Sequence, residues 1–391
     1  MNNGRASQGP PDQKVKEALM FKKNIEAVLN ALVADIPVLL WGPPGTGKTA
    51  SLTHIANRLG WHLEVLVGAT RDRTDFGGFP RYTPEGTVLD PFPWLRRILE
   101  ARREGKEAVL FLDELTSTPE DVRPALLRVI NERVAGDTPI PARVVAAANP
   151  EDHAVGGLLL EPPIANRLLH LEWGMTPQEF AHALREGFET LYPPLPKIPP
   201  EETLQHAQTE ARELLALFLE RNPGAAYHMP KDDQASRAWP SYRTWYLAAQ
   251  FLGTARALGM DEEVQALGVV GLVGPNGYAF LAYVRDLDLP HPADVLRNPT
   301  LVPSRDDRAY ATLQSVVTWI SANWSRENWY GAQKVLAYVG QTKPDIAAPA
   351  ASRLIRVYAE AREKRKPTWD FDPNFVNTFR PVLERVKEVM R

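Results

Sequence analysis

One eight-residue segment constrains this chain more than any other part of its sequence. It fits the pattern G-x-x-x-x-G-K-[ST] and consists of Gly42, Pro43, Pro44, Gly45, Thr46, Gly47, Lys48 and Thr49. An apolar run that predicts a strand precedes it, and apolar residues with helical spacing follow it. Glycines let backbone N–H groups surround phosphate oxygens, and a helix that begins at such a loop directs its positive end toward them. The segment therefore predicts a phosphate-binding loop between a strand and a helix.

The last two residues of this loop predict what it binds. Lys48 offers a point charge to the β- and γ-phosphates of a nucleoside triphosphate, and the Thr49 hydroxyl offers a ligand to Mg²⁺. We therefore expect ATP and Mg²⁺ to bind here, with all eight residues of the loop in the nucleotide site.

Two carboxylates follow a second apolar run. Residues Val109 to Leu112 deliver Asp113 and Glu114 to the C-terminal end of a predicted buried strand, which is the edge where ligands of parallel sheets bind. We expect Asp113 to hold Mg²⁺ through its water shell and Glu114 to polarise the water that attacks the γ-phosphate. Because Mg²⁺ needs only the first carboxylate, the second one indicates hydrolysis rather than a static switch.

An asparagine ends a third apolar run. The side chain of Asn149 follows the run Val144 to Ala148, where its amide could orient the same water. The alternative is an asparagine that opens a turn before Pro150, and on these residues alone that alternative is favoured.

The pattern of apolar runs predicts the organisation of the chain. Five runs suit strands buried on both faces: Val38 to Trp41, Leu63 to Val67, Val109 to Leu112, Val144 to Ala148 and Leu168 to Trp173. They alternate with helical stretches, one of which has Thr118 as its predicted N-cap, so an α/β core with a parallel sheet is expected over 14–174. Residues 1–13 are expected to be a flexible tail, 175–292 an all-helical second domain and 293–391 a helical C-terminal extension.

The composition excludes several classes of function. The chain has 391 residues, no cysteine and a formal net charge of −3. Without cysteine it forms neither a disulfide nor a thiolate metal site, and it has no cysteine nucleophile. The slightly negative charge argues against a protein that coats nucleic acid. No apolar run approaches the roughly 20 residues that span a bilayer, so we expect a cytoplasmic protein with no membrane contact.

The order of these features resembles the AAA+ ATPases, and within them the MoxR-like family, which carries an insert in the second helix. The resemblance covers 14–174 and extends more loosely through 292, so the second domain would be the family's helical lid. It implies that Asn149 is the first sensor of the nucleotide. It also implies two hairpins, one within 75–89 and one within 133–141, that face a central channel or a partner.

The resemblance also assigns two arginines. The segment Ala165 to Leu168 is similar to the family segment that carries an arginine finger, so Arg167 would reach the nucleotide of a neighbouring subunit. The segment Ser241 to Trp245 looks like the lid motif of the second sensor, so Arg243 would touch the γ-phosphate from the same chain. The alternatives are an arginine that caps a helix end and an arginine on a solvated helix face.

The function implied by the resemblance is that of an ATP-driven machine. ATP would bind between the subunits of a homo-oligomeric, hexameric ring, and hydrolysis would drive chaperone-like remodelling, activation or assembly of a partner protein. Residues Gly271 to Pro290 resemble lid helices of members that pair with von Willebrand A-type proteins. Two alternatives remain open: a DNA-directed motor or defence-system component, against which the net charge counts, and a scaffold that uses ATP only to assemble.

Overall fold

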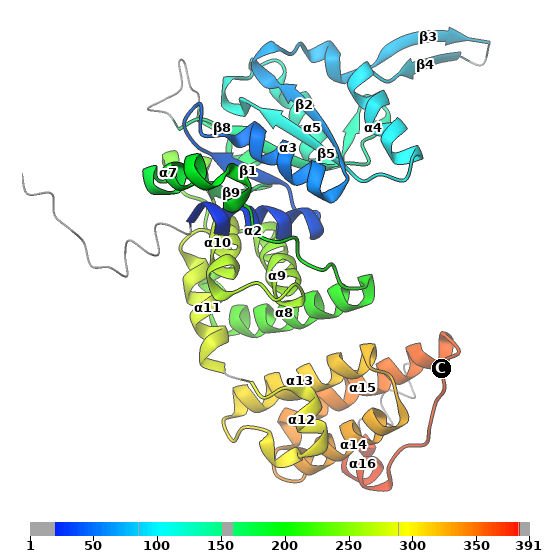
Figure 1. Cartoon of the computed structure of the whole chain (residues 1–391). Helices are drawn as coiled ribbons and strands as arrows, with labels where there is room; N and C mark the ends of the chain where they lie inside the picture. The colour runs from blue at the N-terminus through cyan, green and yellow to red at the C-terminus, as the bar shows by residue number, and fades with distance from the viewer. Residues whose placement is uncertain (1–19, 85, 151–158, 288, 382, 384–391) are drawn as a thin grey trace, which may run out of the picture. The chain divides into compact units, whose positions relative to one another are not determined.

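The computed structural model describes residues 20–84, 86–150, 159–287, 289–381 and 383 (Figure 1). The chain divides into two compact units, of which the first comprises 1–198 with 225–277 and the second 199–224 with 278–391. The expected flexible tail at 1–13 lies outside the described residues. The three functional parts expected over 14–174, 175–292 and 293–391 remain a prediction.

The first unit is built on a parallel sheet, as the sequence predicts. The sheet has the order β2-β5-β8-β1-β9. Its strands are β1 (Val38–Trp41), β2 (His62–Val67), β5 (Ala108–Asp113), β8 (Arg143–Ala148) and β9 (Leu169–Glu172). Each pairing within it is parallel. All five predicted strands are therefore confirmed, and their C-terminal ends share one edge of the sheet.

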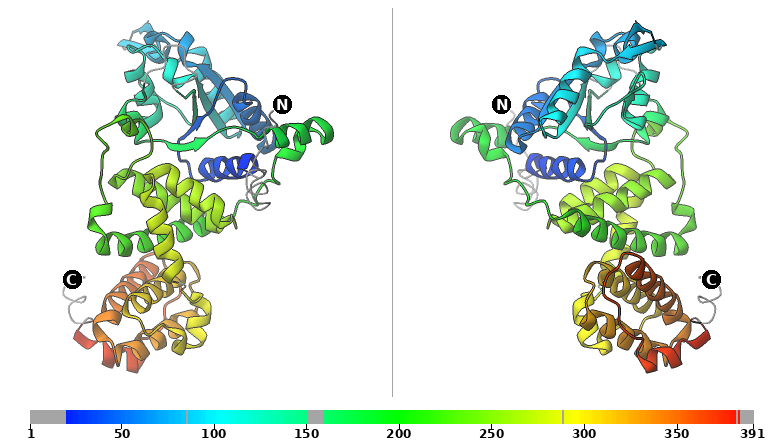
Figure 2. Two further views of the ribbon diagram at one scale, coloured as in Figure 1. Left: turned by 90° about the vertical axis from the view of Figure 1, so that its left-hand side faces the viewer. Right: turned by 90° about the vertical axis from the view of Figure 1, so that its right-hand side faces the viewer.

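Helices cover the sheet, which explains why its strands read as continuous apolar runs. Every residue of β1 is buried, and so is β5 up to Asp113. The helices around the sheet are α2 (Met20–Val33), α3 (Lys48–Leu59), α4 (Pro93–Arg103) and α5 (Arg123–Glu132). Figure 2 shows helices on both sides of it. A strand that is buried on both faces needs apolar side chains at successive positions, so no alternation remains.

The rest of the first unit is mainly helical. Its helices are α6 (Pro162–Ala165), α7 (Pro177–Glu186), α9 (Tyr242–Ala257) and α10 (Glu262–Val273). Helix α10 packs directly on β9, because a Cβ atom at Gly271 would lie 2.4 Å from the carbonyl oxygen of His170. The absence of a side chain at Gly271 therefore allows the helix to approach the edge strand.

Two antiparallel hairpins stand where the sequence predicts them. The first pairs β3 (Phe79–Thr83) with β4 (Gly86–Asp90) and extends away from the sheet (Figure 1). The second pairs β6 (Val134–Ala135) with β7 (Thr138–Pro139). The first hairpin exposes aromatic side chains, since Phe79 is 53% and Tyr82 is 85% accessible. Such residues on a projecting hairpin suit contact with another molecule.

The second unit consists of helices. They are α8 (Glu201–Arg221), most of α11 (Asn276–Leu287), α12 (Pro292–Arg297), α13 (Asp306–Ala322), α14 (Arg326–Gly340), α15 (Pro344–Glu363) and α16 (Pro373–Thr378). The ring of Trp329 is fully buried in the core formed by α12 to α16, where it stacks on Tyr358 at 5.0 Å between ring centroids. Within the part of the chain that the structure describes, no helix combines the length and apolar character needed to cross a bilayer.

A buried histidine joins the edge strand β9 to its neighbour β1. The indole Nε1 of Trp41 donates to Nδ1 of His170 at 2.9 Å, which leaves Nε2 of His170 to donate to the carbonyl oxygen of Ala165 at 2.9 Å. Both ring nitrogens are thus used by the neutral imidazole. Burial, with a smaller contribution from the charge of Arg237, lowers the pKa of His170 to about 4, although the hydrogen bond to Ala165 opposes the shift.

This environment predicts a loss of stability in weak acid. The unfolded chain takes up a proton on His170 near pH 6.5, whereas the folded chain does so only near its pKa of about 4. The contribution is therefore complete above pH 6.5 and is lost as the pH falls toward 4. Between pH 8 and pH 5 it amounts to about 2 kcal/mol.

Chemical unfolding of the parent and of His170→Gln at several pH values measures this effect. Glutamine does not titrate, so the free energy of unfolding of the variant should fall less steeply from pH 8 to pH 5. All other titrating groups are common to both proteins and cancel in the comparison. Identical pH dependence in the two proteins would show that His170 is not held neutral.

Candidate functional site

The predicted phosphate-binding loop connects β1 to α3 as expected. Gly45 and Gly47 both have a φ of 79°, a left-handed conformation that glycine adopts without strain. Gly42 is needed for another reason, because a Cβ atom there would lie 2.2 Å from the carbonyl oxygen of Trp173. Helix α3 begins at Lys48 without a side-chain cap, so the N–H groups of its first turn remain available to an anion.

The Lys48 ammonium is already directed into this loop. Its Nζ donates to the carbonyl oxygens of Gly42 at 2.6 Å and Pro43 at 3.0 Å, and to Oδ1 of Asn149 at 3.3 Å. The side chain is only 8% exposed, and burial lowers the pKa of Lys48 although Asp113 and Glu114 oppose that shift. A buried cation beside an anion-binding loop gains most from a bound phosphate.

The two predicted Mg²⁺ ligands are also together. The Thr49 hydroxyl donates to Oδ2 of Asp113 at 3.1 Å. Neighbouring oxygen ligands of octahedral Mg²⁺, each about 2.1 Å from the ion, lie about 3 Å apart, so this spacing fits the ion. Among the described residues, no group of three or more acidic or histidine side chains is placed to hold a metal. The pair Thr49 and Asp113 therefore suits an ion that takes its other ligands from water and phosphate.

Glu114 follows Asp113 in a backbone conformation that side chains rarely adopt. Its φ is 56° and ψ is 43°, and its N–H donates to Oδ1 of Asp113 at 2.9 Å. Left-handed backbone at a residue other than glycine costs of the order of 1 kcal/mol and is concentrated at functional sites. Glu114 directly follows β5 at the edge that carries Lys48, and its charge acts to raise the pKa of Lys48.

The turn is supported by Thr118 and Gly68, two residues that the sequence pattern does not place in the site. The hydroxyl of Thr118 lies 3.4 Å from the carbonyl oxygen of Glu114. It occupies the space that a side chain at Gly68 would need, because a Cβ atom there would lie 2.2 Å from it. The expected N-cap role of Thr118 is therefore wrong, and α5 begins only at Arg123. In the sequence, this contact is indicated by Gly68, a glycine that directly follows β2.

Arg167, one of the two arginines predicted for the nucleotide site, does not lie at this edge of the sheet. Arg167 follows α6 and precedes β9, and the parallel register pairs Leu169 with Val38 at the start of β1. Arg167 is therefore at the N-terminal edge of the sheet, about four residues or 13 Å of strand from the edge that carries the phosphate loop. Its Nε donates to Oδ1 of Asn131 at 2.8 Å.

Arg243 accompanies Arg167. Burial lowers the pKa of Arg167, and the positive charge of Arg243 lowers it further, so the two guanidinium groups are within electrostatic reach. The buried amide of Asn166 joins their segments, because it donates to the carbonyl oxygen of Trp239 at 3.1 Å and accepts from Ser241 at 2.6 Å. Ser241 is also the N-cap of α9. We call Arg167 and Arg243 the arginine pair.

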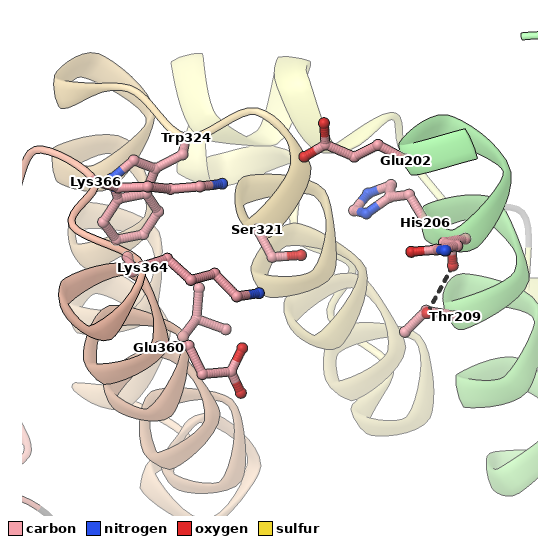
Figure 3. A pocket seen from close by; sticks show the side chains of 11 residues that line it. Glu202, His206, Thr209, Ser321, Trp324, Glu360, Lys364 and Lys366 are labelled. Atoms are coloured by element: carbon pink, nitrogen blue, oxygen red, sulfur yellow. Dashed lines mark hydrogen bonds between the residues drawn. The ribbon is translucent and has the colours of Figure 1, made fainter. Parts of the chain in front are cut away.

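A separate pocket of about 230 Å³ lies in the second unit (Figure 3). It is lined by Glu202, Gln205, His206, Thr209, Ser321, Trp324, Val357, Glu360, Ala361, Lys364 and Lys366. Acidic and basic side chains are mixed in this lining, and it includes none of the residues predicted for the nucleotide site. The candidate site is therefore the sheet edge of the first unit.

Comparison with known proteins agrees with this geometry. Residues 37–168 match the family model of the AAA domain (dynein-related subfamily). The chain is 27% identical to proteasome-activating nucleotidase 1 of Haloferax volcanii over 172 residues, which cover 41% of this chain and 39% of that protein. It is 26% identical to the 26S proteasome regulatory subunit 6B homolog of Dictyostelium discoideum over 153 residues, or 36% and 35% of the two chains.

A relative of the MoxR family is also found. Protein NorQ of Paracoccus denitrificans is 37% identical over 110 residues, which cover 27% of this chain and 38% of that protein. The chain thus spans less than two fifths of the length of each of these three relatives. Residues 37–168 therefore resemble an AAA domain, and the match to NorQ extends the resemblance to a protein of the MoxR family.

Proposed function

We propose that this chain hydrolyses ATP in an assembly of identical copies, with each nucleotide bound by one copy and completed by the arginine pair of the next. The observation that carries the proposal is the polarity of the parallel sheet. One edge collects Lys48, Thr49, Asp113, Glu114 and Asn149, while Arg167 lies at the opposite edge.

The phosphate loop and its neighbours would perform the hydrolysis. Lys48 and the N–H groups at the start of α3 would hold the β- and γ-phosphates, and Thr49 with Asp113 would hold Mg²⁺. When bound, the ion neutralises charge that develops on the phosphate oxygens. Glu114 would take a proton from the attacking water, and Asn149, already bonded to Lys48, would align that water.

The arginine pair would serve the neighbouring copy. Two guanidinium groups that repel each other are stabilised by an anion between them, and a triphosphate is such an anion. Arg167 cannot reach the phosphate loop of its own chain across the sheet, so the phosphates of a second copy are its target. The resemblance assigns Arg243 to the nucleotide of its own chain; because its charge acts on Arg167, we propose that it serves the neighbour's nucleotide instead.

ATP hydrolysis would drive mechanical work on another protein. A hexameric ring would bring the β3–β4 hairpins of its members together, so that Phe79 and Tyr82 present exposed aromatic surface to a substrate. We therefore propose chaperone-like remodelling, activation or assembly of a partner protein, with a von Willebrand A-type protein as the partner class.

The first prediction separates binding from turnover. Glu114→Gln should bind ATP as the parent does but hydrolyse it at least about 10²-fold more slowly, because the general base is removed. Lys48→Ala should lose both binding and hydrolysis. Nucleotide binding by fluorescence and phosphate release measure the two effects, with Glu104→Gln, an exposed acid, as the control. Turnover at the parent rate in Glu114→Gln would refute this mechanism.

The second prediction tests the shared site. Arg167→Ala should bind ATP normally and lose about 10³-fold in kcat, because transition-state charge is no longer stabilised. The specific activity of the parent should also rise with protein concentration as copies assemble. Arg128→Ala, an exposed arginine on α5, is the control. A monomer in which Arg167→Ala leaves hydrolysis unchanged would contradict the proposal.

The alternative of a DNA-directed motor predicts a different response. DNA would then stimulate ATP turnover, and the stimulation would weaken steeply as salt is raised, because phosphate contacts release counterions. The proposed protein-remodelling function predicts no such stimulation at any salt concentration. Phosphate release with and without duplex and single-stranded DNA distinguishes the two.

A further inference from the structure

The segments that bear the arginine pair are connected to the phosphate loop by a continuous set of contacts, of which the hydrogen bonds of His170 and Asn166 are buried. Trp41 is the last residue of β1 and immediately precedes Gly42. Its indole donates to His170, and His170 donates to the carbonyl oxygen of Ala165. Ala165 ends α6, two residues before Arg167. One imidazole therefore ties the strand that carries the loop to the segment that carries the first arginine.

The contacts continue to the second arginine and return to Trp41. The amide of Asn166 binds both Trp239 and Ser241, which precede Arg243. Arg237, from the same segment, places its guanidinium 4.0 Å from the ring centroid of Trp41 and forms an ion pair with Glu172 on β9 at 2.9 Å. The segments that bear the two arginines are thus both connected by these contacts to Trp41, at the end of β1.

We propose that Trp41 and His170 are positioning residues for the arginine pair, so that each copy needs them in order to activate its neighbour's nucleotide rather than its own. This inference rests on the proposed function. Neither side chain is a catalytic residue, because they act through Ala165 and the segment after it.

The chemistry of the His170 side chain supports a role for it beyond filling the core. An aliphatic side chain would occupy the same buried place without the cost of desolvating an imidazole. His170 instead supplies one acceptor and one donor in fixed directions, and both are used. Its backbone carbonyl is contacted by α10 at Gly271, which limits movement of β9. A misplacement of about 1 Å in a catalytic group can cost on the order of 10²-fold in rate, so such rigidity has a use at Arg167.

A mixing experiment tests the inference, because each copy has two separable roles. Lys48→Ala removes nucleotide binding but leaves the arginine pair, and Arg167→Ala does the reverse. Each variant alone should be inactive, and an equal mixture should recover ATP turnover at the sites where Arg167→Ala copies bind nucleotide beside Lys48→Ala copies.

His170→Leu is then added to one component at a time. In the Lys48→Ala copy, which supplies the arginines, it should reduce the recovered turnover at least about tenfold. In the Arg167→Ala copy, which supplies the nucleotide site, it should change turnover less than about twofold. His170→Gln, whose amide can both accept and donate, should restore most of the loss in the arginine-supplying copy.

Two controls separate positioning from damage to the fold. Leu171→Ala truncates a buried side chain on the opposite face of β9, so it should lower thermal stability. Its effect on the recovered ATP turnover should be the same in either component. Trp41→Phe removes the indole donor but keeps an aromatic ring, and it should reproduce the one-sided loss if His170→Leu does not fold.

The outcomes are distinct. Equal loss in both components, or no loss in either, overturns the positioning role while leaving the shared site intact. Failure of the parent mixture to recover any turnover overturns the shared site, and the positioning role with it.

Discussion

The parallel hydrogen bonding of β1 with β8 and β9 determines what the rest of this protein can do. Because β5 runs in the same direction as these three strands, the loop after β1 and the side chains after β5 and β8 share one edge. The segment that enters β9 lies at the other edge. The chain therefore separates the residues that we propose to hold a nucleotide from Arg167, which we propose to complete the site of another copy. A second copy is the simplest way to join them.

Close packing, rather than side-chain chemistry, sets the geometry of the nucleotide edge. Gly42 lets the carbonyl oxygen of Trp173 approach the start of the loop, and Gly68 leaves room for the hydroxyl of Thr118. That hydroxyl supports the left-handed turn at Glu114. A methyl group at either glycine would collide with these atoms. The rare backbone conformation of Glu114 is thus maintained by neighbours from two other parts of the first unit.

Much of this arrangement could be predicted from the sequence, for physical reasons that also explain what could not. The run Val109 to Leu112 predicts β5 because burial on both faces requires successive apolar residues, and the loop motif is local. The role of Thr118 depends on Gly68, fifty residues away, so local spacing indicated only a helix cap. His170 is one of several scattered histidines until Trp41, 129 residues earlier, is placed beside it. The grouping of Arg243 with Arg167 likewise arises from the fold.

The central claim is that phosphates held by one copy are contacted by the arginine pair of another. A cryo-electron microscopy structure of Glu114→Gln, assembled with ATP and Mg²⁺, measures this directly. The account predicts closed assemblies in which the guanidinium groups of Arg167 and Arg243 lie within about 3 Å of phosphate oxygens bound to Lys48 of the adjacent copy. ATP bound in isolated copies, or contacted only by arginines of its own chain, would contradict it.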